Sequence, residues 1–377
     1  MQPSPRKSIK SFQAVSTPVG FKPDAPVDVP KPQPLFQALH WLVGLLVLFA
    51  TISPVGYHIQ AIYRNYLTPK WNAWFNVNPK NTSRYAPGKE MLPVTYFYFF
   101  VVLPLFAAAV VFTFTKTRFR GVTVAHWLHL KPRALGRLVS VGELLFLALL
   151  LVGNVVVAYQ SYTFQVSLKK PKLACFAICL AFSGLYNMVF LALPATRHCF
   201  WMEWLNLPWA RGVKYHRWLG VATIACFVLH FVVFFIHFAD IDSLHELLPC
   251  FDCDISKKEG MDTWINVFGE LSLLCMLIMG ATSIPYVRRH YYATFKATHF
   301  LFVPAAALAV MHYEQIIVWI FVSMVLYIVN RMYSSSTVAT PVALATADAL
   351  PGSVTQLTFR CATTYLPGDI VYVQVPA

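Results

Sequence analysis

Two apolar stretches of the sequence each carry a histidine near both ends. The first stretch holds His216 and His230, and the second holds His299 and His312. Because an α-helix rises about 1.5 Å per residue, the histidines of each stretch would lie about 20 Å apart along a helix. If both helices run in the same direction, His216 lies level with His299, and His230 lies level with His312. Two imidazoles can bind one haem iron from opposite faces. The spacing therefore predicts two stacked b-type haems that relay electrons and leave no open position on iron for substrate.

The composition places these stretches in a membrane. Hydrophobic residues make up 57% of the chain and charged residues only 12%, whereas soluble domains are about 25% charged. Several uncharged runs approach or exceed the roughly 20 residues that a membrane helix needs. The formal charge of +14 does not indicate nucleic-acid binding, because Lys and Arg of membrane proteins collect in cytoplasmic loops. We expect an all-α polytopic membrane helical bundle surrounded by lipid, with no nucleic-acid partner.

The apolar runs predict about eight membrane helices. They cover residues 35–57, 92–115, 138–162, 173–193, 218–238, 264–287, 298–312 and 316–330. We divide the chain into a disordered cytoplasmic tail (1–34), two extra helices with a basic loop (35–137), a six-helix haem domain (138–333), a linker (334–350) and an incomplete flavin-binding domain (351–377).

Loop charge predicts the orientation. The loops after the second, fourth, sixth and eighth helices are basic, and the loop after the fifth is acidic. By the positive-inside rule, the basic loops and both termini are cytoplasmic, in a multi-pass protein of the plasma membrane or an endomembrane. The sequon at Asn81 then lies outside. Lys169, Lys170 and Lys172 oppose this orientation, because they would also lie outside. The two histidine-bearing helices are separated by one helix and therefore run the same way.

The second histidine stretch needs a distorted helix. At about 100° per residue, the fourteen steps from His216 to His230 return to nearly the same face, but the thirteen steps from His299 to His312 miss it by about 140°. Pro304 lies between the latter two histidines. Because proline kinks or rewinds helices, we expect the distortion there.

The first histidine stretch and the loop before it carry a family likeness. The segment Arg197–Gly220 contains Leu207-Pro208 and the run from Tyr215 to Gly220, and His230 follows. It resembles the ferric reductase transmembrane components, a superfamily that includes plant ferric-chelate reductases and NADPH oxidases. The twelve residues between His299 and His312 also match the family's spacing. The likeness covers roughly residues 138–333.

The resemblance implies a route for electrons. They would pass from NADPH to FAD in the cytoplasm, then to an inner haem held by His216 and His299, and then to an outer haem held by His230 and His312. A ferric chelate or another metal acceptor outside would take them. These four histidines would be the cofactor-binding residues and the iron ligands, and electron relay needs no catalytic acid or base. Cations that would lie near the inner pair could neutralise haem propionates or could be ordinary loop charges; they are Arg211, Arg217 and Lys296.

The C-terminal residues resemble the start of the family's flavin-binding β-barrel. Leu366–Ala377 reads LPGDIVYVQVPA, and the sequence contains neither the His-Pro-Phe-Ser/Thr type flavin motif nor a downstream glycine-rich nicotinamide motif. We expect the remaining flavin and nicotinamide modules to belong to a longer chain or to a separate electron-donating partner.

The acceptor stays open between several alternatives. NADPH oxidases typically carry a further histidine where this chain has Phe234, which disfavours reduction of O2 to superoxide. The acidic loop 239–262, with Cys250 and Cys253, could gather ferric iron or could be a solvated loop with a disulfide. Glu270 and Glu143 could assist metal approach or hydrogen-bond neighbouring helices. A histidine-containing ion or proton transporter is the alternative from another class.

Overall fold

The computed structural model describes most of the helical part of the chain. It covers residues 33–59, 63–74, 76, 95–119, 127–136, 138–193, 200–338, 344–350 and 354–359. The tail up to residue 32, the sequon at Asn81 and the segment Leu366–Ala377 lie outside the described residues.

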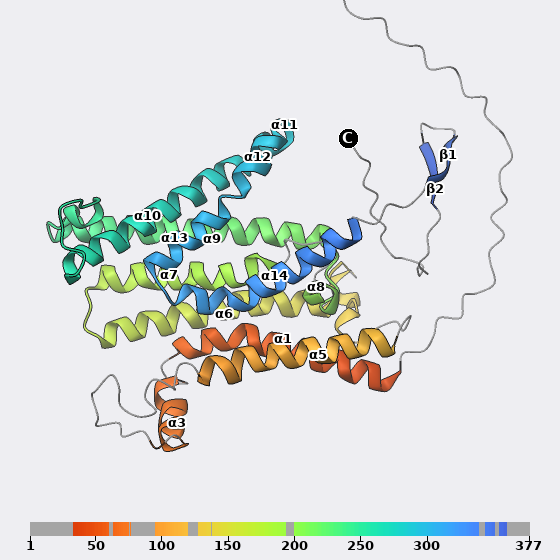
Figure 1. The fold of residues 1–377 in the computed structure, drawn as a ribbon, viewed down its shortest axis with the longest axis horizontal. Helices are drawn as coiled ribbons and strands as arrows, with labels where there is room; N and C mark the ends of the chain where they lie inside the picture. Colours follow the sequence, from red (N-terminus) through yellow and green to blue (C-terminus); the bar gives the residue numbers. More distant parts are fainter. Residues whose placement is uncertain are drawn as a thin grey trace, which may run out of the picture.

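Long apolar helices lie side by side and form a bundle (Figure 1). Within the described residues, seven helical segments are long and apolar enough to cross a membrane, and the apolar helix Ile316–Met332 is shorter. These segments correspond to the predicted eight. The elements that contain them are α1 (Pro34–His58), η2 with α5 (Tyr98–Val102 and Leu103–Arg118), α6 (Val141–Ser167), α7 (Lys172–Leu191), α9 (Trp209–Asp240), α10 (Lys258–Thr282), α12 with α13 (Tyr292–His299 and Phe302–His312) and α14 (Ile316–Val338).

Short helices connect or flank the long ones. They are η1 (Tyr63–Leu67), α3 (Thr68–Trp74), η3 (Trp127–His129), η4 (Arg133–Leu135), α8 (Phe200–Trp204), η6 (Leu244–Leu247) and α11 (Pro285–His290).

Some helices of the bundle pack closely against each other. Helix α7 packs against α6 and α9, α10 packs against α13, and α1 packs against α5 and α14. In Figure 1, α1 and α5 lie together along one side of the bundle. Apolar side chains such as Leu151, Val155 and Val221 are about 70% exposed, as expected of a surface that faces lipid.

Helix α9 begins earlier than the sequence predicts. It starts at Trp209, directly after Pro208, whereas the apolar run suggests a start at residue 218. The polar residues between Trp209 and Trp218 hid this part of the helix, although Pro208 is a typical residue at a helix start. His216 therefore lies well inside α9 and is held by regular helical backbone.

The second histidine stretch is broken, and the break precedes the proline. Helix α12 ends at His299 and α13 begins at Phe302. The backbone N–H groups of Phe300, Leu301 and Val303 each donate to the carbonyl three residues earlier. Such bonds wind the chain by about 120° per residue instead of 100°, which reduces the phase error between the two histidines. Pro304 lies in the first turn of α13, where a missing N–H is tolerated.

The first turn of α6 is built for close contact with the chain after α8. Ser140 caps α6, because its Oγ accepts from the Glu143 N–H at 3.2 Å and donates to the Leu205 carbonyl at 3.3 Å. A Cβ atom on Gly142 would lie 2.2 Å from that same carbonyl oxygen. Glycine is therefore required by this approach of two backbones.

The C-terminal described residues form a hairpin. Strands β1 (Leu344–Leu350) and β2 (Val354–Phe359) pair antiparallel, with Leu350 opposite Val354 and an irregularity between Leu344 and Thr346. The predicted linker 334–350 therefore contains a strand, which its Ala- and Thr-rich composition concealed. The described residues show this two-stranded sheet and not a flavin-binding β-barrel.

Replacing Gly142 by Ala should lower the melting temperature of the purified protein in detergent. The added methyl group must displace backbone, and such overpacking costs about 1–3 kcal/mol. Gly56→Ala is the control, since its Cβ would meet only the Tyr96 hydroxyl, at 3.7 Å. Equal melting temperatures for the two variants would contradict the close approach.

Candidate functional site

The structure brings the four histidines together in two pairs, and each pair joins α9 to the α12–α13 segment. The ring centres of His216 and His299 lie 6.1 Å apart with an interplanar angle of 61°. Those of His230 and His312 lie 6.3 Å apart with an angle of 75°. We call these the inner pair and the outer pair, after the orientation expected from loop charge.

Backbone carbonyls fix the tautomer of three of these rings. The Nδ1 atoms of His216, His230 and His312 lie 2.8 Å from the carbonyl oxygens of Leu191, Ala177 and Ile265, respectively. Because a carbonyl can only accept, each Nδ1 carries the proton. The lone pair then resides on Nε2, the arrangement seen in metal-binding histidines.

His299 differs from the other three histidines. Its Nδ1 atom is buried and has no hydrogen-bond partner among the described residues. The ring lies 5.2 Å from the Phe295 ring, centre to centre. Its orientation is therefore set by packing next to the break between α12 and α13.

The separation of the rings suits one metal ion between each pair. An imidazole–metal bond is about 2.0 Å and the ring centre lies about 1.2 Å beyond the nitrogen, so two axial imidazoles on one ion have centres about 6.4 Å apart. The observed 6.1 and 6.3 Å agree with that value. The described residues contain no group of three or more His, Cys, Asp or Glu side chains that could hold a metal. Each pair thus fits an ion whose other ligands belong to a cofactor, as in haem.

A cavity of about 400 Å³ adjoins the outer pair. Its walls come from α7, α9, α10 and α13 and are mainly apolar, with phenylalanines at 182, 227, 231 and 234. Gly269 on α10 lets the His312 ring lie against that helix, since a Cβ atom there would be 2.7 Å from the His312 Nδ1. The backbones of α9 and α13 do not pack closely, which leaves the space between them to the imidazoles and the cavity.

Comparison with known proteins shows what part of this bundle is similar to. Residues 180–310 match the family model described as "Ferric reductase like transmembrane component". That segment includes α9, α10, α12 and most of α13, with His216, His230 and His299, and His312 lies two residues beyond it. Residues 180–310 are thus similar to the ferric reductase-like transmembrane family.

Curated relatives extend the likeness beyond that segment. Ferric reduction oxidase 2 of Arabidopsis thaliana is 29% identical over 216 residues, which cover 56% of this chain and 28% of the relative. Ferric reduction oxidase 7, chloroplastic, of the same plant is 32% identical over 130 residues, 34% of this chain and 16% of the relative. Dual oxidase 2 of Rattus norvegicus is 23% identical over 179 residues, 42% of this chain and 12% of the relative. The chain thus spans less than a third of the length of each of these three relatives.

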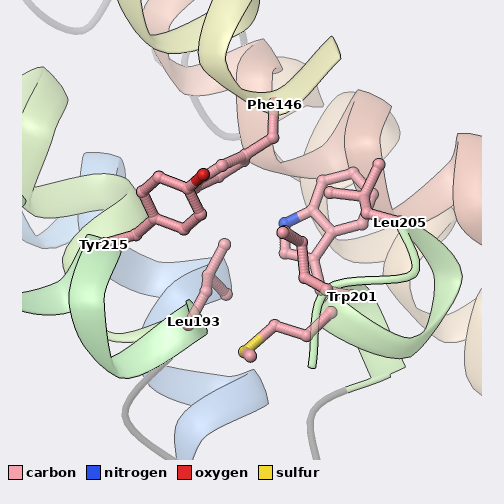
Figure 2. A pocket seen from close by; sticks show the side chains of 8 residues that line it. Phe146, Leu193, Trp201, Leu205 and Tyr215 are labelled. Carbon is pink, nitrogen blue, oxygen red and sulfur yellow. The ribbon is translucent and has the colours of Figure 1, made fainter. Parts of the chain in front are cut away.

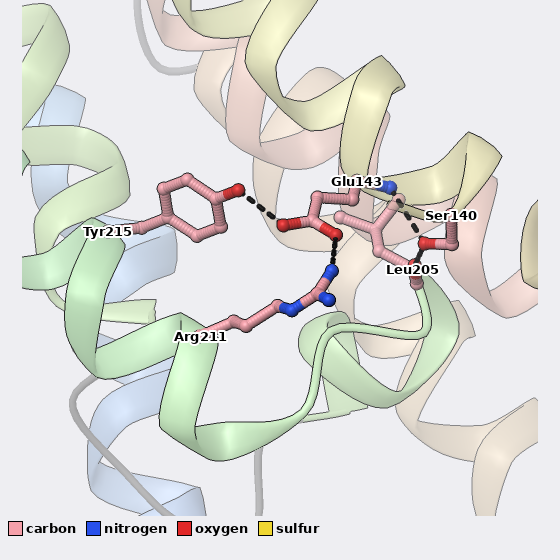
Figure 3. A network of polar contacts seen from close by, with 5 residues as sticks. All are labelled: Ser140, Glu143, Leu205, Arg211 and Tyr215. Atoms are coloured by element: carbon pink, nitrogen blue, oxygen red, sulfur yellow. Dashed lines mark hydrogen bonds and ion pairs between the residues drawn. The ribbon is translucent and has the colours of Figure 1, made fainter. Parts of the chain in front are cut away.

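A buried carboxylate organises the inner end of the ferric reductase-like bundle (Figure 3). Glu143 on α6, with a side chain only 3% exposed, forms an ion pair with Arg211 and accepts a hydrogen bond from the Tyr215 hydroxyl. Both partners lie on α9, and Tyr215 directly precedes His216. The network therefore fixes the start of the helix that carries one histidine of each pair.

This network resolves two residues that the sequence left open. Glu143 joins neighbouring helices, and Arg211 is its ion-pair partner. Arg217 and Lys296 are exposed, and Lys214 lies over the Trp218 ring, 4.5 Å from its centre. These three cations thus face outward.

A small void lies beside the network (Figure 2). It measures about 10 Å³ and has an apolar lining that includes Phe146, Leu193, Trp201 and Tyr215. A site for water needs at least about that volume together with several polar partners. The void is therefore a packing gap and not a ligand site.

The described part of the acidic loop after α9 shows neither a metal site nor a disulfide. Cys250 and Cys253 are free thiols, and the Cys253 Sγ lies 3.1 Å from the Cys250 carbonyl oxygen, so the expected alternative of a disulfide is not found. Asp254 accepts hydrogen bonds from Ser256, which lower the pKa of that carboxyl. The acidic side chains of this described loop do not converge on a metal site.

Residues near the outer pair include polar groups that sequence reasoning overlooked. Gln165 and Asn266 line the cavity together with Lys170, Glu270 and Tyr313. Asn266 donates to the Glu246 carbonyl at 3.2 Å. Burial raises the pKa of Tyr313, with a further contribution from Glu314. Phe234 packs edge-on to His230, with ring centres 5.1 Å apart.

Replacing Glu143 by Leu should lower the stability of the purified protein by about 1–3 kcal/mol, because Tyr215 and Arg211 lose their acceptor. The loss is below that of a fully buried pair, since the Arg211 side chain is 36% exposed. Glu143→Gln keeps the shape and an acceptor oxygen and should cost less. Thermal unfolding in detergent measures both variants, and equal melting temperatures for Glu143→Leu and the unmodified chain would contradict the role of the network.

Proposed function

We propose that this chain is the haem-bearing part of a ferric-chelate reductase. Electrons from cytosolic NADPH would pass through FAD and two b-type haems to ferric iron on the other side of the membrane. The proposal depends on one observation: the same two helical segments bring together two imidazole pairs, with ring centres 6.1 Å apart in one pair and 6.3 Å apart in the other. The names of the plant relatives support ferric reduction.

The four histidines have defined tasks in this proposal. His216 and His299 would hold the inner haem, and His230 and His312 would hold the outer one. Haem at these positions supplies one-electron redox chemistry at iron. The carbonyls of Leu191, Ala177 and Ile265 would keep the Nδ1 atoms of three of these histidines protonated and their Nε2 atoms directed at the metal, because ligand orientation depends on such outer hydrogen bonds. These three are His216, His230 and His312.

The protein around the outer pair would exclude water and control access. The phenylalanines of α7 and α9 would line the apolar part of the cavity. The low dielectric of such surroundings strengthens the influence of any nearby charge on electron transfer. Both termini would be cytoplasmic, in the plasma membrane or an endomembrane, and a flavin domain or flavoprotein partner would deliver electrons at the inner end.

Reduction of O2 is the second candidate, because dual oxidase 2 is among the relatives. Phe234 favours ferric iron over O2, since NADPH oxidases carry a histidine at that position and this chain presents an apolar ring to His230. Superoxide release from the reduced chain in air, measured with a superoxide-specific probe, would favour this second candidate.

A dithionite-reduced minus oxidised absorption spectrum tests the proposal. We expect a low-spin b-type spectrum with about two haems per chain, because each imidazole pair binds one iron. His230→Ala should reduce the content to about one haem per chain and abolish electron transfer to external acceptors. A flat spectrum from folded protein that was supplied with haem during expression would refute haem ligation and favour the transporter alternative.

Gly269→Ala should selectively weaken the outer haem site. The added methyl group would lie 2.7 Å from the His312 Nδ1, so the ring must leave the Ile265 carbonyl. We expect about one haem per chain, as for a lost imidazole pair. Gly280→Ala on the same helix is the control, because its methyl group would meet only the flexible tip of Ile224 at 2.9 Å. Full haem content in both variants would show that Gly269 does not position His312.

A further inference from the structure

The two imidazole pairs differ in the hydrogen bonds of their rings. In the outer pair, His230 and His312 each place Nδ1 2.8 Å from a backbone carbonyl oxygen. In the inner pair, His216 does the same, but the Nδ1 of His299 is buried without a hydrogen-bond partner among the described residues. The outer pair therefore has two such bonds, and the inner pair has one.

Helix α10 provides a carbonyl for the outer ring of the α12–α13 segment but not for the inner one. It packs against both α12 and α13. It runs antiparallel to them, because its contacts move from His312 to lower residue numbers as α10 continues from Ile265. Ile278 lies thirteen residues after Ile265, and His299 lies thirteen residues before His312. The Ile278 carbonyl is therefore the counterpart of the one that binds His312.

A threonine hydroxyl occupies the carbonyl of Ile278. A helix carbonyl accepts from the N–H four residues later and keeps a second lone pair for another donor. Four residues after Ile265 the chain has glycine, so no side chain competes with His312 for that lone pair. Four residues after Ile278 it has Thr282, whose Oγ1 donates to this carbonyl at 2.9 Å and lies 2.7 Å from the Thr298 hydroxyl. The acceptor that would serve the inner ring is thus taken.

The missing acceptor changes how strongly an imidazole donates to iron. A hydrogen bond from Nδ1–H to a carbonyl makes the ring more basic and a better ligand. Stronger donation stabilises ferric iron more than ferrous iron, because the ferric ion carries the higher charge. A pair with two such bonds therefore holds the ferric state more firmly than a pair with one, and its midpoint potential is lower.

We propose that the two haem sites have unequal midpoint potentials, and that His299, left without an acceptor by Thr282, gives the inner site the higher one. This inference rests on the proposed function, because it requires haem at both pairs. Transfer from the inner iron to the outer iron moves one electron without bond cleavage or proton transfer, and it would be uphill at equilibrium. A membrane potential that is negative inside drives electrons outward and would offset the difference.

The charges near the two pairs act in the same direction as the hydrogen bonds. Arg217 and Lys296 are exposed cations at the inner end, and Glu270 is a half-buried carboxylate that lines the outer cavity. Positive charge favours an added electron and negative charge disfavours it. Lys170 at the outer cavity opposes this trend, but it is exposed, so solvent screens its charge. Charge and hydrogen bonding thus both favour the electron at the inner site.

Potentiometric titration of variants with a single haem tests the inequality. Two reduced haems repel each other, and such coupling splits the apparent potentials even of identical sites. His230→Ala should retain the inner haem and His216→Ala the outer haem, so each midpoint is measured without coupling. We expect the inner site to be preferred by the electron about three- to tenfold, where tenfold corresponds to about 59 mV for a one-electron couple.

Phe295→Gln tests whether the missing acceptor is the cause. Residue 295 lies four positions before His299 on α12, and the two ring centres are 5.2 Å apart, so a side chain there can reach the ring. Because Nδ1–H can only donate when Nε2 binds iron, the Gln amide would offer its oxygen. In the His230→Ala background, the inner midpoint should fall toward that of the outer site. Phe295→Leu removes the ring without adding an acceptor and is the matched control.

Thr282→Gly gives a second comparison from the opposite helix. It frees the Ile278 carbonyl and reproduces the glycine spacing found beside His312. We expect it to lower the inner midpoint and to leave the outer midpoint, measured in the His216→Ala background, unchanged. A change in packing alone would not shift the two midpoints in this selective way.

Equal midpoints in the two single-haem variants, or a higher midpoint at the outer site, would overturn the inference and leave the haem relay intact. An inner midpoint that is the same in Phe295→Gln as in Phe295→Leu, and that Thr282→Gly does not lower, would also overturn it. A chain that binds no haem at all would refute the proposed function itself.

Discussion

The spacing of imidazoles across the gap between α9 and the α12–α13 segment constrains the whole bundle. Two rings must face each other at about 6 Å, twice, at heights about 20 Å apart. Helix α9 meets this condition with regular winding, because fourteen steps return to the same face. The partner segment has only thirteen steps, and it is interrupted between His299 and Phe302. The bonds of Phe300, Leu301 and Val303 overwind that segment in the direction that the thirteen steps require.

Helix α7 orients the two imidazoles of α9. Its carbonyls at Ala177 and Leu191 accept from His230 and His216, respectively. These two carbonyls are fourteen residues apart, the same separation as the two histidines, and α7 runs antiparallel to α9 along its length. Leu191 is the last residue of α7. Its carbonyl therefore accepts no hydrogen bond within the helix and is free to accept one from His216. One close helix–helix contact thus orients a ring of each pair. Helix α10 does the same for His312 through Ile265.

Much of this arrangement was accessible from the sequence, and the parts that were not share a physical cause. Histidine spacing and apolar runs predict which helices face each other, because both are carried by side-chain type. The carbonyls at 177, 191 and 265 could not be predicted, since any residue at those positions offers the same backbone oxygen. The close approaches at Gly142 and Gly269 are also properties of neighbouring elements and not of local sequence. Pro208 did signal the start of α9, but the polar residues after it were interpreted as a loop.

The charged side chains at the two ends of the bundle differ in whether they are paired. At the inner end, Gly142 brings α6 close to the chain after α8, and Glu143 then lies among Arg211 and Tyr215 with its charge compensated. A compensated carboxylate positions α9, while Arg217 and Lys296 remain exposed there. At the outer end, Lys170 and Glu270 both line one cavity and have no ion-pair partner in the described part of the chain. Lys170 is exposed, so water solvates its charge, whereas Glu270 is half-buried. The inner end therefore uses a buried, paired charge to position α9, whereas the described charges that line the outer cavity form no such pair.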